Sequence, residues 1–450
     1  MKANMTKSNV PVVMLLRAGI LMSASAVTGC TLTDQENGDT ETCQVQLCGD
    51  VTPCYLQLCG IVPNGSNNAD ASTLNRLISQ TYVAISWPAN IAAGRGVALA
   101  PTDPSALATY IDQPRVWETW KQDWEAQGDI AALTDWDSYE YRAGRPPCDE
   151  VHLRNGQVIP VTEANWTELR KAHGMVLDKI NLVEANNDGL AVLSGPLIED
   201  NGTYQRFATF FNQPLYECWR TGTGPGCSKE GRLHVPAADG STPGAIMVKS
   251  AWRELIQADI DAQTFLSRNL LVLDPGQGGK RECHERTMGL TALHVVYKDA
   301  DLPAKHQWLW GSLEYQANDL PKCLSSEGGV GYQNKAPPVT CEPLPPGKPT
   351  DACRIKDIPD GFYSQMNTAS ALGSLPGALK SYQMVAAQWG MQTGDTVQAS
   401  PPEAANARFE TYSQKSSCLG CHEKTSASDA IWSLSKEIKE LNGNPCAYQQ

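Results

Sequence analysis

Apolar side chains at helical spacing predict helices in the first part of the chain. Residues 72–87 (STLNRLISQTYVAISW) carry them every three or four positions, and Pro88 ends the run. In residues 115–127 three tryptophans recur at i, i+3 and i+7, which is more typical of a core-facing stripe than of a cofactor site. Residues 163–185 are predicted to form a further helix that begins after Thr162.

Short apolar runs separated by Gly, Pro and Asp predict strands in the centre of the chain. They lie at residues 202–212, 245–250, 269–274, 289–298 and 306–316. Alternation places Trp308 and Trp310 on one face of the last run. Leu309 and Leu313 fall on the other face, so we expect this strand to be covered on both sides.

Helical patterns return after a long loop rich in Pro, Gly and Cys (residues 318–360), which we expect to be held by disulfides. The later helices are predicted at residues 376–389, 402–416 and 426–441. We therefore expect an α+β fold with helical N- and C-terminal segments around a β-rich centre.

Residues 1–30 have the pattern of an export signal. Two lysines precede an apolar run that ends in Val-Thr-Gly-Cys30, and this run is too short to span a membrane. The match to a bacterial lipobox predicts that Cys30 is lipidated and begins the mature chain. Thr31 in the next position indicates the outer membrane. The alternative is ordinary secretion with Cys30 unmodified.

Residues 31–70 are expected to form a polar linker with a small repeat in it. Cys43 and Cys48 are echoed eleven residues later by Cys54 and Cys59. Two disulfide-held turns explain the repeat, and a metal site is the alternative. The globular body then occupies residues 71–450. Its length exceeds the ~250–300 residues of one simple core, which is compatible with two packed lobes.

The chain is acidic, and this limits its partners. It has 36 Lys and Arg against 49 Asp and Glu. Because residues 1–30 hold three basic and no acidic residues, the mature chain has 33 against 49, a net charge of −16. This charge argues against nucleic acid as a partner and favours a protein with a basic face. We expect contact with the membrane through the lipid anchor alone.

The strongest motif is Cys418-Leu-Gly-Cys421-His422. This spacing is the signature of c-type haem attachment, in which two thiols bind the porphyrin and the histidine binds the iron. The alternatives are a redox-active cysteine pair, a structural disulfide and half of a zinc site. The motif lies in the C-terminal part that is predicted to be helical. We expect one covalent haem c, with His422 as the proximal ligand.

The cysteine count is compatible with this assignment. Of 15 cysteines, lipidation of Cys30 leaves 14. Haem attachment at Cys418 and Cys421 then leaves 12, enough for six disulfides in an oxidising compartment. The parity favours a modified Cys30, but it does not distinguish a haem from a disulfide at the motif.

A sixth iron ligand has to come from upstream of the motif, unless the iron is five-coordinate. Neither Met nor His follows His422. His294, in the predicted strand TALHVVY, is the first candidate, although a histidine on an apolar face is commonly a core residue. Met384 and Met391 are further candidates that could equally fill the core. His284, in ECHE, is interpreted as a surface residue of a disulfide loop.

Several segments resemble a group of bacterial exported proteins described only as the "cytochrome c family", with one Cys-x-x-Cys-His motif near the C-terminus. They are residues 82–90 (YVAISWPAN), 114–125 (PRVWETWKQDWE), 197–204 (LIEDNGTY), 245–255 (AIMVKSAWREL), 288–298 (MGLTALHVVYK), 307–318 (QWLWGSLEYQAN) and 410–422. The resemblance implies haem at Cys418 and Cys421, His422 as ligand, and a histidine-containing strand at His294. Tyr315 stands where the family has a histidine, and no activity is implied.

Three functions are compatible with these features. We expect an exported c-type cytochrome lipoprotein that transfers single electrons in the periplasm or at the outer membrane. The alternative is a haem enzyme, a peroxidase or an oxidase of a small substrate, with an open iron site. One haem needs only ~100 residues of core to shield it. In a haem enzyme, the additional residues of this chain would form a substrate pocket. A structural or sensory surface protein is the third possibility.

Overall fold

A computed structural model describes most of the globular body. It covers residues 71–99, 113–127, 130–141, 147–185, 191–239, 243–275, 280–304, 306–316, 334–338, 348–355, 377–404 and 406–422, and positions 62, 429, 431 and 434. The predicted signal peptide, Cys30, the linker, most of the loop at residues 318–360 and nearly all of the helix at residues 426–441 lie outside these residues. No helix among the described residues is long and apolar enough to cross a membrane.

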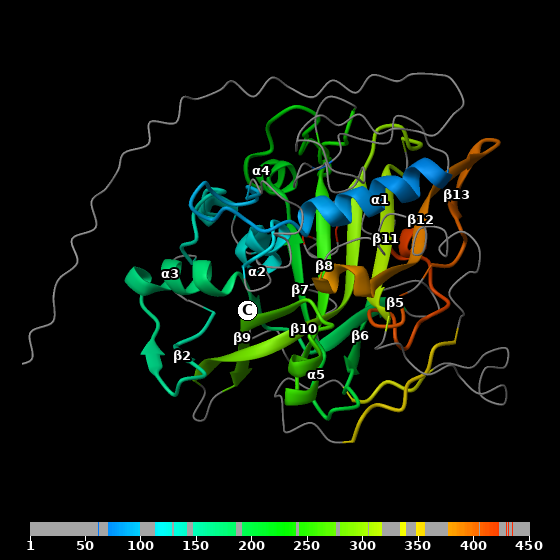
Figure 1. Cartoon of the computed structure of the whole chain (residues 1–450). Helices are drawn as coiled ribbons and strands as arrows, with labels where there is room; N and C mark the ends of the chain where they lie inside the picture. Colours follow the sequence, from blue (N-terminus) through cyan, green and yellow to red (C-terminus); the bar gives the residue numbers. More distant parts are fainter. Residues whose placement is uncertain are drawn as a thin grey trace, which may run out of the picture.

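One large sheet dominates the described part (Figure 1). Its main path, in spatial order, is β1 (Lys121–Gln122), β7 (Arg206–Phe211), β8 (Ile246–Glu254), β10 (Arg281–Lys298), β11 (Trp308–Tyr315), β12 (Tyr382–Thr393) and β13 (Thr396–Ser400). All neighbours on this path are antiparallel. Such strands can bury one or both faces, and β11 is buried along its whole length.

The long strand β10 joins two parts of this sheet. Its second half pairs with β8 and β11, whereas its first half pairs with two other strands. The strands of this second part are β9 (Ser267–Pro275), β2 (Glu150–His152), β3 (Val158–Pro160) and β4 (Val176–Leu177). A separate hairpin contains β5 (Asn181–Ala185) and β6 (Ala191–Pro196).

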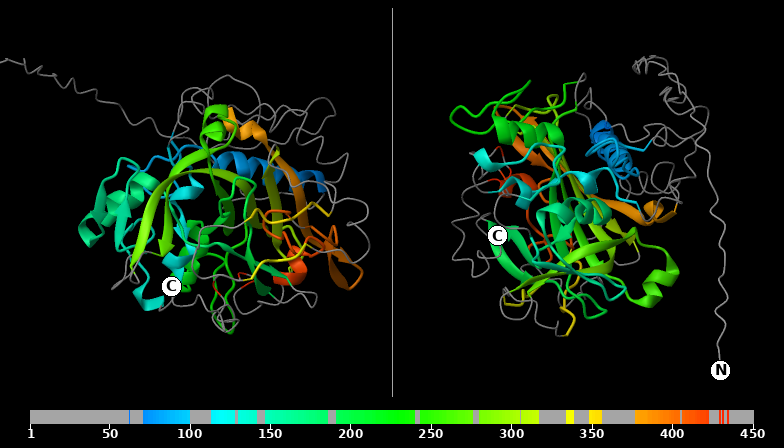
Figure 2. Two further views of the ribbon diagram at one scale, coloured as in Figure 1. Left: turned by 90° about the horizontal axis from the view of Figure 1, so that it is seen from below. Right: turned by 90° about the vertical axis from the view of Figure 1, so that its left-hand side faces the viewer.

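Helices cover the sheet unevenly. They are α1 (Ala71–Ile85), α2 (Asp123–Ala126), α3 (Glu163–His173), α4 (Gln213–Thr221), α5 (Gln257–Ala262) and α7 (Cys418–His422). α1 crosses one face so closely that a Cβ on Gly311 of β11 would collide with Ile78. The red segment around α7 lies on the opposite face (Figure 2). The sheet is therefore packed on both sides, as expected for β11.

Two disulfides close loops of very different length. Cys148 is bonded to Cys283, 135 residues away, and Cys218 to Cys227, nine residues away. The first joins the segment before β2 to β10, and both of its cysteines are fully buried. Disulfide-held segments are thus present in the described part, as the cysteine content predicts.

Of the predicted α+β fold, the β-rich centre and the helix α1 are present in the structure. All five predicted strands are present as β7 to β11, and the helix predicted at residues 72–87 is present as α1. The helix predicted at residues 163–185 ends early, at His173. Gly174 follows with φ +75, a conformation that suits glycine after a helix, and the chain then enters β4.

Three predicted helices are wrong. Residues 115–127 form a 3-10 turn, β1 and the short α2, because Trp117 packs edge-on against Phe210 and β1 pairs with β7. In the helix predicted at residues 376–389, the described residues 377–389 form the turn η7 (Gly377–Ser381) and then part of β12, since pairing with β11 outweighs the helix preference of the alanines. The chain at residues 402–416 forms turns in its described positions.

Side-chain hydrogen bonds of Asn406 and Arg408 account for the turns in the described residues between 402 and 416. Asn406 is fully buried, and its side-chain oxygen accepts the Arg408 N–H at 2.8 Å. Such bonds compete with helical ones. The Arg408 guanidinium also binds both carboxylate oxygens of Glu199, at 3.0 and 2.9 Å. The described residues between 402 and 416 are therefore not helical as predicted, and the motif forms the short helix α7.

Candidate functional site

The Cys-x-x-Cys-His motif forms α7. Ser417 caps this turn: its hydroxyl accepts the Gly420 N–H at 3.0 Å, and its carbonyl accepts the Cys421 N–H at 3.0 Å. Both motif cysteines are thiols and are partly buried. Because residues three apart lie on one side of a helix, the turn presents the two thiols together. The intervening Leu419 is 3 % exposed and packs into the main core.

α7 is fixed to β12 by one buried side chain. The Oε1 of Gln388 accepts the Leu419 N–H at 2.8 Å and the Ser417 hydroxyl at 3.2 Å. Its Nε2 donates to the carbonyl of Pro401 at 2.7 Å. Gln388 is completely buried, so these bonds are shielded from water. The motif is therefore held by the rigid sheet.

His422 lies against β11. Its ring centroid is 5.3 Å from that of Trp310. Trp310 is buried and contacts Trp308, whose indole N–H donates to the carbonyl of Asp429 at 3.0 Å. His422 and Asp429 thus each lie against one of two neighbouring tryptophans.

His294 lies on the same face of the sheet as the motif. Ser312 is opposite His294 in the β10–β11 pair, and Trp310 is two residues before Ser312. Gln388 is opposite Trp310 on β12, and Lys249 is opposite His294 on β8. Opposite residues and alternate residues of a strand share a face. We call this the motif face, defined by Lys249, His294, Ser312, Trp310 and Gln388.

The imidazole of His294 is oriented on this face but keeps one nitrogen unbonded. Its Nδ1 makes a 2.8 Å hydrogen bond with the Ser312 hydroxyl, and its ring packs on Phe409 at 4.2 Å between centroids. The Nε2 is buried and makes no hydrogen bond; Glu410 Oε1 lies 3.4 Å away, at ion-pair distance. A buried imidazole nitrogen of this kind is suited to bind a metal.

Burial and nearby charges shift the pKa of two groups at this face, the Glu410 carboxyl and the Cys418 thiol. Burial alone would raise the pKa of Glu410, but His294 and Lys249 outweigh it and hold the pKa below its usual value. Burial raises the pKa of the Cys418 thiol well above its usual range, and Glu410 and Cys421 add to this shift. The lowered pKa that activates a redox-active thiol is therefore not found at Cys418.

These residues fit a covalently attached haem. Two thiols lie on one helical turn, the adjacent histidine packs against Trp310, and His294 Nε2 is a buried nitrogen whose polar neighbour is Glu410 Oε1 at 3.4 Å. The hydrogen bond at its Nδ1 resembles the outer-shell bond that usually orients a ligating histidine. Cys418 and Cys421 would hold the group, and His422 and His294 could ligate its iron.

The two methionine candidates lie elsewhere. Met384 is completely buried and pairs with Leu313, which alternation places on the face that α1 covers. Met391 is 50 % exposed near the β12–β13 turn. Neither is on the motif face. His284 is on β10, next to the disulfide of Cys283, and is partly exposed.

Sequence reasoning missed several residues of the motif face. Lys249 interrupts the apolar run of β8 (IMVKSAW), and this break in the pattern is a usable signal. Ser312, Gln388 and Glu410 carry no such signal, because their partners are distant in the sequence.

No family model, curated protein or solved structure matches the chain.

Proposed function

We propose that this protein is an exported c-type cytochrome that carries one covalent haem and transfers single electrons. The observation that supports it best is the pair of thiols, Cys418 and Cys421, on one capped helical turn that ends in His422. The buried Nε2 of His294 on the same face supports a second protein ligand. Two protein ligands favour electron transfer, because they close the iron to small molecules.

The chain's own residues would tune such a centre. A bound haem supplies a one-electron couple at its iron. Ser312 fixes the ring of His294 through Nδ1, Trp310 excludes water beside His422, and Gln388 holds the motif turn against the sheet. Burial and hydrogen bonds of this kind set the reduction potential of an iron centre.

The sequence supports a location and a kind of partner for such a cytochrome. A lipidated Cys30 would anchor the chain to the outer membrane, facing the periplasm or the cell surface. The net charge of −16 would steer a redox partner with a basic face toward it.

A haem enzyme is the second candidate, and one observation favours it. Ser312, His294 and Glu410 form a chain of proton-exchanging groups, with contacts of 2.8 and 3.4 Å, beside Lys249. Such a chain can hold or move a proton at His294 Nε2. If His294 does not ligate the iron, this group could serve a substrate at an open site.

Replacing Cys418 and Cys421 by alanine tests the haem assignment. In the parent protein we expect haem to stay on the polypeptide after acid–acetone extraction, and we expect none on the double variant. A Cys218→Ala/Cys227→Ala variant is the control, because it also removes two cysteines but leaves the motif. Extractable haem in the parent protein, or covalent haem on the Cys418/Cys421 variant, would refute the proposal.

Optical and EPR spectra of the same preparations separate the two candidates. A low-spin ferric spectrum that carbon monoxide does not alter after reduction supports the electron carrier. A high-spin ferric spectrum with immediate carbon monoxide binding supports the enzyme, and hydrogen peroxide turnover would then be measured.

A further inference from the structure

The tripeptide pattern Glu-x-His occurs twice, on two neighbouring parallel strands. Glu150 and His152 are on β2, and Glu282 and His284 are on β10. The register places Glu282 opposite Glu150 and His284 opposite His152. All four side chains therefore point to one face, with two imidazoles side by side and two carboxylates side by side.

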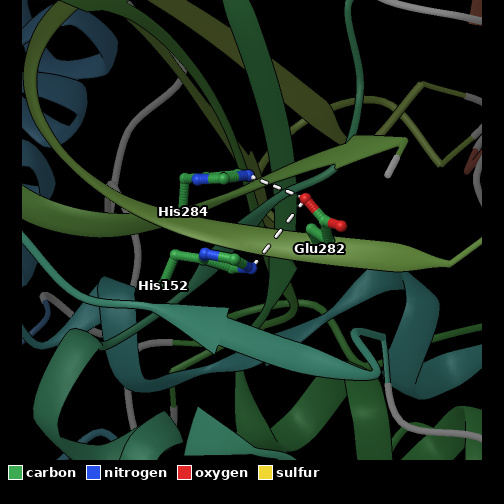
Figure 3. Close-up of side chains that lie close together, drawn as sticks. All are labelled: His152, Glu282 and His284. Atoms are coloured by element: carbon green, nitrogen blue, oxygen red, sulfur yellow. Dashed lines mark ion pairs between the residues drawn. The ribbon is translucent and has the colours of Figure 1, made fainter. Parts of the chain in front are cut away.

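The two imidazoles converge on one carboxylate (Figure 3). Their rings stack at 4.6 Å between centroids. The Nε2 of His152 lies 3.8 Å from Glu282 Oε2, and the Nε2 of His284 lies 3.5 Å from the same oxygen. Glu150 Oε1 lies 3.0 Å from His152 Nε2. Among the described residues this is the one group of three or more His, Cys, Asp or Glu whose ligand atoms gather within 4.8 Å.

We propose that His152, His284 and Glu282 bind a zinc ion. Zinc–nitrogen and zinc–oxygen bonds of about 2.0–2.1 Å at tetrahedral angles put neighbouring ligand atoms about 3.4 Å apart. The nitrogen-to-oxygen distances of 3.5 and 3.8 Å are close to that value. Two imidazoles and a carboxylate are a ligand set that zinc uses, commonly with a fourth position left to water.

The local charge fits a cation. Like charges directly opposite each other in a sheet are destabilising, and Glu150 and Glu282 form such a pair. Lys280 reaches Glu150 at 3.6 Å but is 61 % exposed, so it offsets little of this repulsion. Arg286, the next residue but one after His284 on β10, binds Glu254 and Asp274 instead. A divalent ion between the strands would neutralise both carboxylates.

The scaffold beneath the site is rigid. Val151 and Cys283, which alternate with the ligands, are completely buried on the opposite face of their strands. Cys283 is bonded to Cys148, two residues before β2. Ligands on paired strands with a disulfide below them keep their spacing without the metal. Their side chains are 20–32 % exposed, so solvent can supply the ion and a fourth ligand.

This centre is separate from the Cys-x-x-Cys-His motif. Its ligands lie on the first half of β10 and on β2, whereas the motif face uses the second half of β10 with β8, β11 and β12. The proposal therefore does not depend on haem binding. Glu150 is positioned to take the fourth coordination site or to accept a hydrogen bond from a zinc-bound water.

Equilibrium dialysis of the full-length purified protein against Zn²⁺, followed by elemental analysis, tests the site. We expect one zinc ion per chain, in addition to any haem iron. In a His152→Gln/His284→Gln variant we expect the zinc Kd to rise by about 100-fold or more. His306→Gln is the matched control, because it removes a partly buried histidine beyond the far end of β10, and it should bind zinc as the parent does.

X-ray absorption at the zinc edge gives a second readout. Two imidazole nitrogens and one or two oxygens in the zinc shell of the parent protein would support the assignment, and sulfur in that shell would contradict it. Circular dichroism without zinc shows whether the double variant keeps its fold. Equal zinc affinity in the parent and in a folded double variant would overturn the proposal. If the double variant fails to fold, the conservative Glu282→Gln variant must lose zinc affinity for the proposal to stand.

Discussion

The side-chain oxygen of Gln388 accepts the backbone N–H of Leu419 at 2.8 Å, although 31 residues separate the two in the sequence. The same side chain also bonds Ser417 and Pro401. The turns at residues 402–416 lead into α7. The buried side chain of Gln388 therefore bonds polar groups before these turns, at Pro401, and after them, at Ser417 and Leu419. The position of the motif depends on the sheet through this amide.

Gln388→Leu should lower the free energy of unfolding by about 3 kcal/mol. The substitution leaves the Leu419 N–H and the Pro401 carbonyl without their bonds to the amide, and each such loss costs roughly 1–3 kcal/mol. Urea denaturation measures the change. Gln392→Leu on the exposed end of the same strand is the control and should stay within about 0.5 kcal/mol of the parent. An unchanged midpoint in Gln388→Leu would show that the amide does not hold the turn.

The sequence predicted the elements whose pattern is local. α1 has a helical stripe of apolar residues, and the predicted runs in β7 to β11 are short and rich in apolar residues. The prediction of a helix was wrong at β12, where Ala386 and Ala387 favour a helix in isolation. There the partner strand β11, some 70 residues earlier in the chain, decides the conformation. A pairing over that distance leaves no trace in a short window of sequence.

The candidate site follows the same division between local and distant signals. Spacing alone singles out Cys418, Cys421 and His422 as candidates, and a place in an apolar strand singles out His294. The hydrogen bond of Ser312 to His294, and the approach of Glu410 to the same ring, require the register of two strands and a turn. The Glu-x-His pairs of β2 and β10 were missed for the same reason, since their match exists only across a parallel ladder.

Glu125 makes the protein sensitive to acid. Its buried carboxylate lies 2.7 Å from Arg95, 3.3 Å from Arg170 and 3.7 Å from Lys121. Burial alone would raise the pKa of Glu125, but these three cations outweigh it and lower the pKa from 4.5 to about 2. Because the folded pKa is below the unfolded one, the stabilisation is complete above pH 4.5. It is lost as the pH falls toward 2. The difference corresponds to about 3 kcal/mol.

Glu125→Gln should therefore remove this part of the acid transition. At pH 7 the variant should lose about 3–5 kcal/mol, because three buried cations lose their shared carboxylate. Urea titrations between pH 2 and pH 7 measure both effects. Glu168→Gln, at a carboxylate that is 78 % exposed, should leave the pH profile unchanged. A Glu125→Gln profile as steep as that of the parent would contradict the assignment.

The disulfides Cys148–Cys283 and Cys218–Cys227 should differ in their effect on stability. In the chain-entropy account, closing the loop between Cys148 and Cys283 is worth about 5 kcal/mol, and closing the loop between Cys218 and Cys227 about 3 kcal/mol. Paired alanine substitutions, compared by urea denaturation without reductant, test this order. The two variants serve as controls for each other. Equal losses, or a larger loss for the short loop, would show that strain or residual structure outweighs loop entropy.

His294→Ala tests whether this residue binds the iron of the proposed haem. We expect the ferric protein to change from low spin to high spin, and the reduced protein to gain carbon monoxide binding. The reason is that the Nε2 of His294 is a buried nitrogen on the motif face, with Glu410 Oε1 3.4 Å away as its polar neighbour. Met384→Leu and Met391→Leu are the controls, since neither methionine lies on that face. EPR and optical spectra of the three variants give the comparison. A low-spin spectrum that survives in His294→Ala but is lost in Met384→Leu would move the ligand to the methionine.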